Sequence, residues 1–270
     1  MKPRASSHLA VWAVGLAALF GLRYLPPDTS LDRVQRSGTL TVCHPASLPP
    51  YVTYHPDEAR ADGLEAERVM GIARALGVRV QWNPQVNWYV TRDPTAWGVR
   101  KGSCDVLAGG IAATDASRGL LVLSKPYLRV SWAMIARRAP REGDRVALWV
   151  PYLGLDRVRM RATELLTARG FQPYFPGSAE QAARALAGHE VVALLTDEPT
   201  ARWVAQQLAG HVPLFVAPEP ALGTFQLALG FWKGDVTLER AVNRALESAL
   251  GQAGEETPGD AGGQFGSAPQ

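Results

Sequence analysis

Apolar and polar residues recur along the first half of the chain with two different periods. Short apolar or β-branched runs at Thr39–Cys43, Val78–Trp82 and Asp105–Ala108 predict strands. Between the first two runs, apolar residues recur every three or four positions over 63–76, which predicts an amphipathic helix. A second, short helix is predicted over Trp97–Lys101. This order of strands and helices is typical of a parallel sheet covered by helices.

The second half of the chain repeats the alternation. Strands are predicted over Tyr127–Arg137, Val146–Val150, Val191–Leu195, Val212–Val216 and Leu227–Phe231, and helices over Arg159–Arg169, Ser178–Ala187, Pro199–Leu208 and Leu238–Leu250. Ser178 and Gln181 have the spacing of a capping box at the start of one helix. Two α/β alternations in one chain indicate two lobes with a cleft between them.

The N-terminus has the pattern of a targeting segment. Lys2 and Arg4 precede an uncharged apolar run, Leu9–Leu22. As a helix this run is about 21 Å long, short of the roughly 30 Å needed to span a bilayer core. We expect residues 1–30 to be a signal peptide or an uncleaved signal anchor, and a buried N-terminal helix is a third interpretation. The polar tail, 251–270, is expected to be disordered.

Composition and charge narrow the functional classes. The 270 residues carry a net charge of +3, with the positive side chains spread along the chain, so nucleic-acid binding is not expected. None of the five histidines has a His or Cys partner at metal-ligand spacing, and no G-x-S-x-G or phosphate-loop motif is present. We therefore expect neither an enzyme nor a metal or other cofactor.

A strand, a glycine pair and a helix start follow one another in the stretch from Cys104 to Tyr127. Gly109 and Gly110 free the backbone N–H groups at the end of the predicted strand, and Thr114 and Asp115 can cap the next helix. Ligands bind at the carboxyl ends of strands in open parallel sheets. The unit predicts a site for a small ligand, although the same residues also suit a plain connecting turn.

Seven phrases in order resemble the extracytoplasmic solute-binding proteins of polar amino-acid ABC transporters, family 3. They are LDRVQRSGTLTV, LPPY, DGLEAERVMGIARALGV, VRKGSCDVLAGGIAATD, LSKPYL, LAGHEVVALLTDEPTA and FWKGDVTLERAVNRAL. The resemblance implies an α/β fold of two lobes, each a mostly parallel sheet flanked by helices, joined by two hinge crossings. Lobe 1 would contain 31–128 and 226–250, and lobe 2 would contain 129–225.

The same resemblance implies a function. The chain would be an exported, periplasmic or otherwise extracytoplasmic monomer that binds a small polar, amine-bearing solute between its lobes. It would deliver this solute to the membrane permease of an ABC transporter.

The carboxylate side of the family's site is altered here. An Arg on the helix after the glycine turn usually holds the ligand carboxylate, but Ser117 takes that position and Arg118 lies one residue late, about 100° around a helix. Ala112 replaces the usual Thr, Pro45 the usual Asp, and Leu48 the usual stacking aromatic residue. Either a local shift brings Arg118 back, or the ligand is not a plain α-amino acid.

The cation side is retained. Asp197 matches the acid that usually holds the ligand's ammonium, with Thr196 beside it, although an Asp ahead of a helix is also a common N-cap. The Gly110 backbone and Ser117 or Arg118 would hold the opposite end of the ligand. Trp88 or Tyr51 would cover it.

Lobe 1 also resembles a branch of solute-binding-like proteins encoded with periplasmic quinoprotein alcohol dehydrogenases. The phrases TVCHPASLPP, WNPQVNWYVTR and GSCDV carry this resemblance. It implies an alternative function, an accessory or sensor protein that contacts a periplasmic dehydrogenase without transport.

The branch carries Cys at both cysteine positions, which implies a disulfide between Cys43 and Cys104. The predicted strands argue against it, because Cys43 ends one strand and Cys104 precedes its neighbour. That offset is about 13 Å, and a bridge needs Cα atoms within about 7 Å. The pairing is thus left open, and the strands favour two unpaired thiols.

Overall fold

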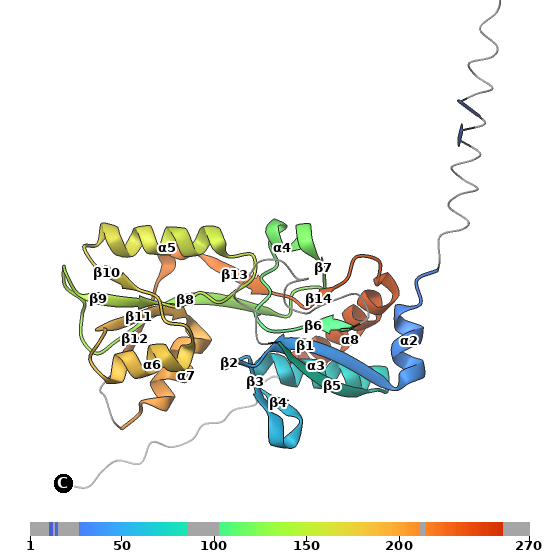
Figure 1. Cartoon of the computed structure of the whole chain (residues 1–270), viewed down its shortest axis with the longest axis horizontal. Helices are drawn as coiled ribbons and strands as arrows, with labels where there is room; N and C mark the ends of the chain where they lie inside the picture. Colours follow the sequence, from blue (N-terminus) through green and yellow to red (C-terminus); the bar gives the residue numbers. More distant parts are fainter. Residues whose placement is uncertain (1–10, 13, 16–26, 86–102, 211–213, 256–270) are drawn as a thin grey trace, which may run out of the picture.

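The computed structural model contains two β-sheets side by side, each with helices packed against it (Figure 1). It describes residues 11–12, 14–15, 27–85, 103–210 and 214–255. Within these ranges no helix is both long and apolar enough to cross a membrane. The predicted helix Trp97–Lys101 lies outside the described residues, as does most of the apolar run Leu9–Leu22.

The first sheet, which defines lobe 1, has the strand order β5-β1-β6-β14-β7. Its strands are β1 (Thr39–Pro45), β5 (Arg79–Gln85), β6 (Val106–Leu107), β7 (Val122–Leu123) and β14 (Gly230–Phe231). Its helices are α2 (Ser30–Ser37), α3 (Leu64–Leu76), α4 (Asp115–Leu120) and α8 (Val236–Glu255). β5, β1 and β6 run parallel. α2 and α3 pack on α8, which buries Leu238, Val242 and Leu246 at helical spacing.

The second sheet, which defines lobe 2, has the order β10-β9-β11-β8-β12, and β13 also pairs with β8. Its strands are β8 (Leu128–Ala136), β9 (Arg145–Leu148), β10 (Gln172–Tyr174), β11 (Ala193–Asp197), β12 (Phe215–Pro218) and β13 (Thr224–Leu227). Its helices are α5 (Asp156–Ala168), α6 (Ala179–Ala187), α7 (Glu198–Gln207) and the short η3 (Pro220–Leu222). Figure 1 shows α5 on one side of this sheet and α6 and α7 on the other.

Two antiparallel strands connect the lobes. β8 leaves lobe 1 and β13 returns to it, paired from Thr224↔Ser131 to Leu227↔Leu128. Immediately after β13, the N–H of Ala228 donates to the carbonyl oxygen of Ile111 in lobe 1 at 2.9 Å. These strands are the two crossings that the resemblance implied.

A small antiparallel sheet, β2-β3-β4, projects from lobe 1. It consists of β2 (Ser47–Leu48), β3 (Val52–His55) and β4 (Arg60–Asp62), with η1 (Pro56–Glu58) at its tip. The turn between β2 and β3 carries Tyr51, and this turn brings Tyr51 to the interlobe site described below.

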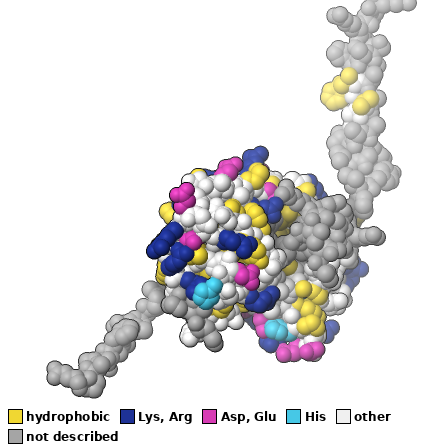
Figure 2. Space-filling model, turned by 60° about the vertical axis from the view of Figure 1, so that its left-hand side comes forward, with side chains coloured by type: hydrophobic (Ala, Val, Ile, Leu, Met, Phe, Trp, Pro, Cys, Tyr) yellow, Lys and Arg dark blue, Asp and Glu magenta, His cyan; other side chains and the backbone are white. Residues whose placement is uncertain are grey.

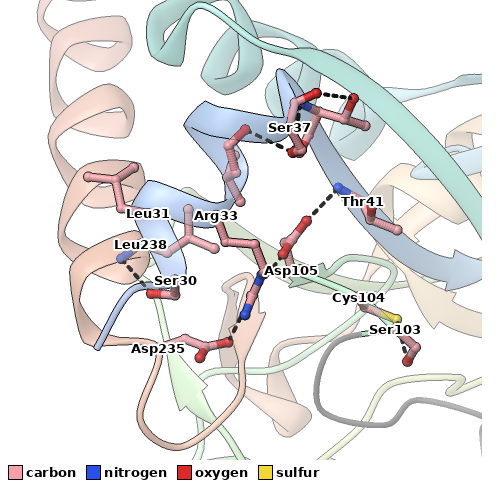
Figure 3. A network of polar contacts seen from close by, with 12 residues as sticks. Ser30, Leu31, Arg33, Ser37, Thr41, Ser103, Cys104, Asp105, Asp235 and Leu238 are labelled. Carbon is pink, nitrogen blue, oxygen red and sulfur yellow. Dashed lines mark hydrogen bonds and ion pairs between the residues drawn. The ribbon is translucent and has the colours of Figure 1, made fainter. Parts of the chain in front are cut away.

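Asp105 fixes the entry to β6 (Figure 3). Its carboxylate accepts a hydrogen bond from the backbone N–H of Thr41 and another from the guanidinium of Arg33, both at 2.9 Å. The Arg33 side chain also lies 3.9 Å from the carboxylate of Asp235 (Figure 3). The buried carboxylate of Asp105 therefore ties α2, β1 and the start of β6 together.

The two cysteines form a disulfide, so the expectation of unpaired thiols is wrong. The Cα atoms of Cys43 and Cys104 are 5.6 Å apart. The chain bends at Asp105, so Cys104 does not continue the line of β6 backwards, as the offset estimate assumed. Because the hydrogen bonds of Asp105 hold this bend, Cys104 lies beside Cys43 in a buried cluster.

Most predicted elements occur within a few residues of their predicted bounds. The capping residue Ser178 accepts a hydrogen bond from Gln181 N, as the spacing predicted, whereas the Gln181 side chain accepts from Gly177 N instead of the cap itself. α8 continues to Glu255, so its last turn overlaps the tail predicted to be disordered from Gly251. Residues 256–270 lie outside the described part of the chain.

Candidate functional site at the junction of the lobes

The glycine turn after β6 faces lobe 2. Gly110 has a φ of +78°, and its N–H donates to Oε2 of the buried Glu65 at 3.1 Å. A Cβ on Gly110 would approach Tyr152 to 2.9 Å and Leu48 to 3.0 Å, closer than side chains normally pack. Both the backbone conformation and the space therefore require glycine here. The predicted N-cap of α4 is present, since Thr114 Oγ1 accepts from Ser117 N.

A lobe-2 segment after β9 occupies the groups that the turn could offer to a solute. The N–H of Leu153 donates to Gly110 O at 3.0 Å, and the N–H of Ala112 donates to Leu153 O at 3.1 Å. The hydroxyl of Ser117 donates to the same Leu153 oxygen at 3.3 Å, and the hydroxyl of Thr114 donates to Gly154 O at 3.3 Å. The backbone of lobe 2 thus lies where the resemblance placed a ligand carboxylate.

Asp197 lies on the lobe-2 side of the junction and has no exposed surface. It ends β11 and caps α7, because its Oδ1 accepts from the backbone N–H of Thr200 at 2.9 Å. Its Oδ2 accepts from the hydroxyl of Thr196 at 3.2 Å. The structure therefore shows that Asp197 is the N-cap of α7, which is one of the two roles that the sequence suggested for it.

The hydroxyl of Tyr51, from lobe 1, donates to Oδ1 of Asp197 at 2.7 Å. The Tyr51 ring is fully buried and meets the Tyr152 ring edge to face, with centroids 5.9 Å apart. Tyr152 in turn packs on Phe225, which lies in the second crossing, β13. The chain's own phenol therefore occupies the position at Asp197 where a ligand ammonium was expected.

Burial sets the protonation of this cluster. It raises the pKa of Tyr51 and of Tyr152 well above the usual value, and the negative charge of Asp197 adds to the effect in each case. Burial also raises the pKa of Glu65, against the opposing effect of the nearby Tyr127 hydroxyl and of the glycine turn. Both phenols thus remain neutral at any physiological pH.

The other residues expected to contact a solute are distributed unevenly. Leu48 and Ala112 are fully buried, and Thr196 donates to Trp149 O at 2.9 Å as well as to Asp197. The Arg118 side chain is exposed on α4. Trp88 lies outside the described residues.

Sequence reasoning missed four residues at this junction: Glu65, Tyr127, Tyr152 and Leu153. The available signal for Tyr152 and Leu153 was their place directly after the predicted strand Val146–Val150, at the end of a strand where ligands bind in open sheets. Glu65 lies in the first turn of the helix predicted over 63–76. The spacing of apolar residues that predicts this helix does not show that a carboxyl group in it is buried.

The described residues bear on two other kinds of site, a metal centre and a pocket. In these ranges no three His, Cys, Asp or Glu side chains group so that they could hold a metal ion. A hollow of about 580 Å³ lies over α5, lined by Met160, Thr163, Glu164, Thr167 and Ala168. Its lining shares no residue with the junction of the lobes.

Solved structures of amino-acid-binding proteins share this fold. The ancestral amino-acid-binding protein AncCDT-1, a precursor of cyclohexadienyl dehydratase, is 20% identical with a TM-score of 0.65, covering 83% of this chain and 94% of that one. A Streptococcus pneumoniae ABC uptake transporter substrate-binding protein with bound histidine is 18% identical with a TM-score of 0.67, covering 84% and 92%. These likenesses confirm the predicted two-lobed α/β fold.

A curated relative is the membrane-bound lytic murein transglycosylase F of Alcanivorax borkumensis, 27% identical over 136 residues. That match covers 50% of this chain and 27% of the relative, so the chain spans about a quarter of the relative's length. The model of the bacterial extracellular solute-binding proteins, family 3, matches residues 40–253. The chain therefore belongs to family 3 of the bacterial extracellular solute-binding proteins.

Proposed function

We propose that this protein is a non-catalytic, extracytoplasmic accessory module, which docks onto a protein partner while its interlobe site stays closed on its own side chains. One observation carries the proposal: Tyr51 of lobe 1 donates its hydroxyl to Asp197 of lobe 2 at 2.7 Å. In a solute receptor of this fold, the solute joins the two lobes. Here a side chain of the protein joins them.

The carboxylate side of the junction supports the same function. A solute carboxylate would need the N–H of Ala112 and the hydroxyl of Ser117, and both donate to Leu153 O. A solute could take these donors only by displacing the lobe-2 backbone. The displaced peptide groups would then need new partners, at about 1–3 kcal/mol for each one left buried and unpaired.

The partner we propose is a periplasmic quinoprotein alcohol dehydrogenase, on the strength of the lobe-1 resemblance. The disulfide between Cys43 and Cys104 suits an oxidising compartment. On the face seen in Figure 2, Lys and Arg side chains lie scattered between acidic and apolar ones. Such a mixed surface suits a protein partner better than a polyanion. The N-terminal segment would direct export, as a signal peptide or as an anchor.

The first test is a thermal-shift screen of purified protein against amino acids, amines and small organic acids. We expect no saturable rise in Tm, because a ligand at 100 times its Kd would add about 2.7 kcal/mol to the free energy of unfolding and be readily seen. The second is biolayer interferometry against a purified periplasmic quinoprotein alcohol dehydrogenase, where we expect saturable binding.

A second candidate is the transport receptor of an ABC permease, for an amine-bearing solute. The retained Asp197 and the family membership favour it. A saturable thermal shift with an amine, lost in Asp197→Asn, would establish this function and overturn the accessory role. If no compound raises the Tm and the dehydrogenase does not bind, both the accessory role and the transport function are overturned.

A further inference from the structure

The junction of the lobes is built around one phenol. The Tyr51 ring has no exposed surface, its hydroxyl is bonded to a carboxylate of the other lobe, and its face meets the edge of another buried ring. These are the contacts that a protein makes with a bound aromatic ligand: enclosure, one charge-assisted hydrogen bond and one ring contact.

The backbone at Tyr51 is held without the help of its side chain. Its N–H donates to Leu48 O at 2.8 Å, and its carbonyl oxygen accepts from the N–H groups of Glu65 and Ala66 at the start of α3. Gly63 approaches the same carbonyl so closely that a Cβ there would overlap it. The turn should therefore keep its place when the ring is removed.

The acceptor is equally independent of Tyr51. The carboxylate of Asp197 is oriented by Thr200 N on one oxygen and by the Thr196 hydroxyl on the other. It would still point into the space that the ring vacates. Removal of the ring thus leaves an enclosed cavity with an oriented carboxylate at one end and the Tyr152 ring at its side.

We propose that the junction is a phenol-binding site whose ligand is the chain's own Tyr51, a tethered ligand that holds the lobes together. The site takes a small, uncharged, para-substituted phenol in place of the side chain. The inference rests on the proposed function, which holds that the protein's own side chains close the site, and it deepens that function by naming the chemical class that the site takes.

The experiment uses Tyr51→Gly with para-cresol, which has the atoms that this variant lacks. Isothermal titration calorimetry should show saturable binding of one para-cresol to the variant and none to the unchanged protein. Toluene has nearly the same shape without the hydroxyl. We expect it to bind about tenfold or more weakly, because it cannot replace the hydroxyl that Tyr51 donates to Asp197.

Two matched variants identify the acceptor and the location. Asp197→Asn in the Tyr51→Gly background should abolish most of the preference for para-cresol over toluene. Tyr127→Gly also removes a buried tyrosine ring of lobe 1, but one whose hydroxyl makes no hydrogen bond to Asp197, and should not acquire an Asp197-dependent preference. A folded Tyr51→Gly protein that binds neither compound, or that binds both equally, overturns the proposal.

If the Tyr51→Gly protein does not fold, a second measurement on another variant tests the proposal. Tyr51→Phe keeps the ring and removes only the bond to Asp197. Hydrogen exchange of the interlobe amides of Ala112 and Leu153 should become several-fold faster in this variant, while the amide of Val42 within the lobe-1 sheet keeps its rate. Unchanged exchange at Ala112 and Leu153 would show that Tyr51 does not hold the lobes.

Discussion

His44 is a buried histidine whose titration should be visible in the stability of the whole protein. It has no exposed surface, lies against the rings of Tyr54 and Trp82, and has Nδ1 2.8 Å from Pro45 O. Among the described residues, Nε2 has no hydrogen-bond partner. Burial lowers the pKa of His44, against the opposing effect of the Pro45 carbonyl.

The fold therefore favours neutral His44, and the unfolded chain takes up the proton first as the pH falls. The contribution to stability is complete above about pH 6.5, the usual histidine pKa, and is lost as the pH falls below it toward the folded pKa. Urea midpoints should decline over this window in the unchanged protein and decline less in His44→Phe. His55→Phe, at an exposed histidine, is the control and should retain the decline. Equal slopes in the unchanged protein and His44→Phe would contradict the prediction.

Two residues, Asp197 and Tyr51, show what could and what could not be predicted from the sequence. Asp197 and Tyr51 were both expected at the interlobe site, one as the acceptor and one as a cover, and both lie there. Their bond to each other was not foreseeable, because it joins residues 146 positions apart and depends on how closely the lobes approach. The pairing of residues within a site is set by tertiary packing, which local patterns do not contain.

At the scale of elements, local signals predicted most of the structure. The glycine pair and Thr114 placed the turn after β6 and the start of α4, and Ser178 placed the start of α6. The disulfide was missed because strand spacing assumes a straight chain, whereas Asp105 bends it. A bend held by a side chain from another element has no signal in the periodicity.

The disulfide closes a long loop, and we expect it to stabilise lobe 1. Its cysteines are 61 residues apart, for which restriction of the unfolded chain gives about 2–4 kcal/mol. Urea unfolding of the unchanged protein with and without reductant should show this loss. The variant with both Cys43→Ala and Cys104→Ala should unfold early and be indifferent to reductant. A midpoint that reductant does not move, with two free thiols titrated, would refute the estimate.

Asp28 supplies a cap for α8 from outside that helix. Its carboxylate accepts from Thr237 N at 2.6 Å and from Ser30 N at 2.9 Å. Burial would raise the pKa of Asp28, but these hydrogen bonds outweigh it and lower the pKa from 3.8 to about 2. The carboxylate is thus favoured by the fold, and its contribution is present above about pH 4 and lost as the pH falls toward 2.

Asp28→Asn should therefore cost about 1 kcal/mol of unfolding free energy at pH 6, in the range of other N-caps. The difference from the unchanged protein should shrink between pH 4 and pH 2, measured by urea unfolding. A difference that stays constant down to pH 2 would exclude the carboxylate as its cause.

At the scale of the whole molecule, the lobes meet through backbone as well as side chains. Gly154 of lobe 2 has a φ of +85°, and a Cβ there would overlap the hydroxyl oxygens of Ser117 and Thr114 in lobe 1. Gly143 has a φ of +84°, yet a Cβ there would meet nothing within 4 Å. The two glycines thus share one backbone conformation and differ in whether a methyl group touches the other lobe.

We expect Gly154→Ala to destabilise the protein more than Gly143→Ala, by about 1–3 kcal/mol, the usual cost of overpacking. The added methyl should also push the lobes apart, so that the radius of gyration from small-angle X-ray scattering rises in Gly154→Ala and not in Gly143→Ala. Equal stability and an equal radius in both variants would show that the lobes do not pack tightly at Gly154.

The bond between Tyr51 and Asp197 has a consequence for signalling. A receptor that closes only around its solute reports the solute's concentration, because each closed receptor molecule holds one bound solute molecule. A protein closed by its own phenol has no such input. Any partner that recognises the closed shape would respond to the number of copies exported and not to the nutrients around the cell. Regulation would then act on synthesis and export of the protein.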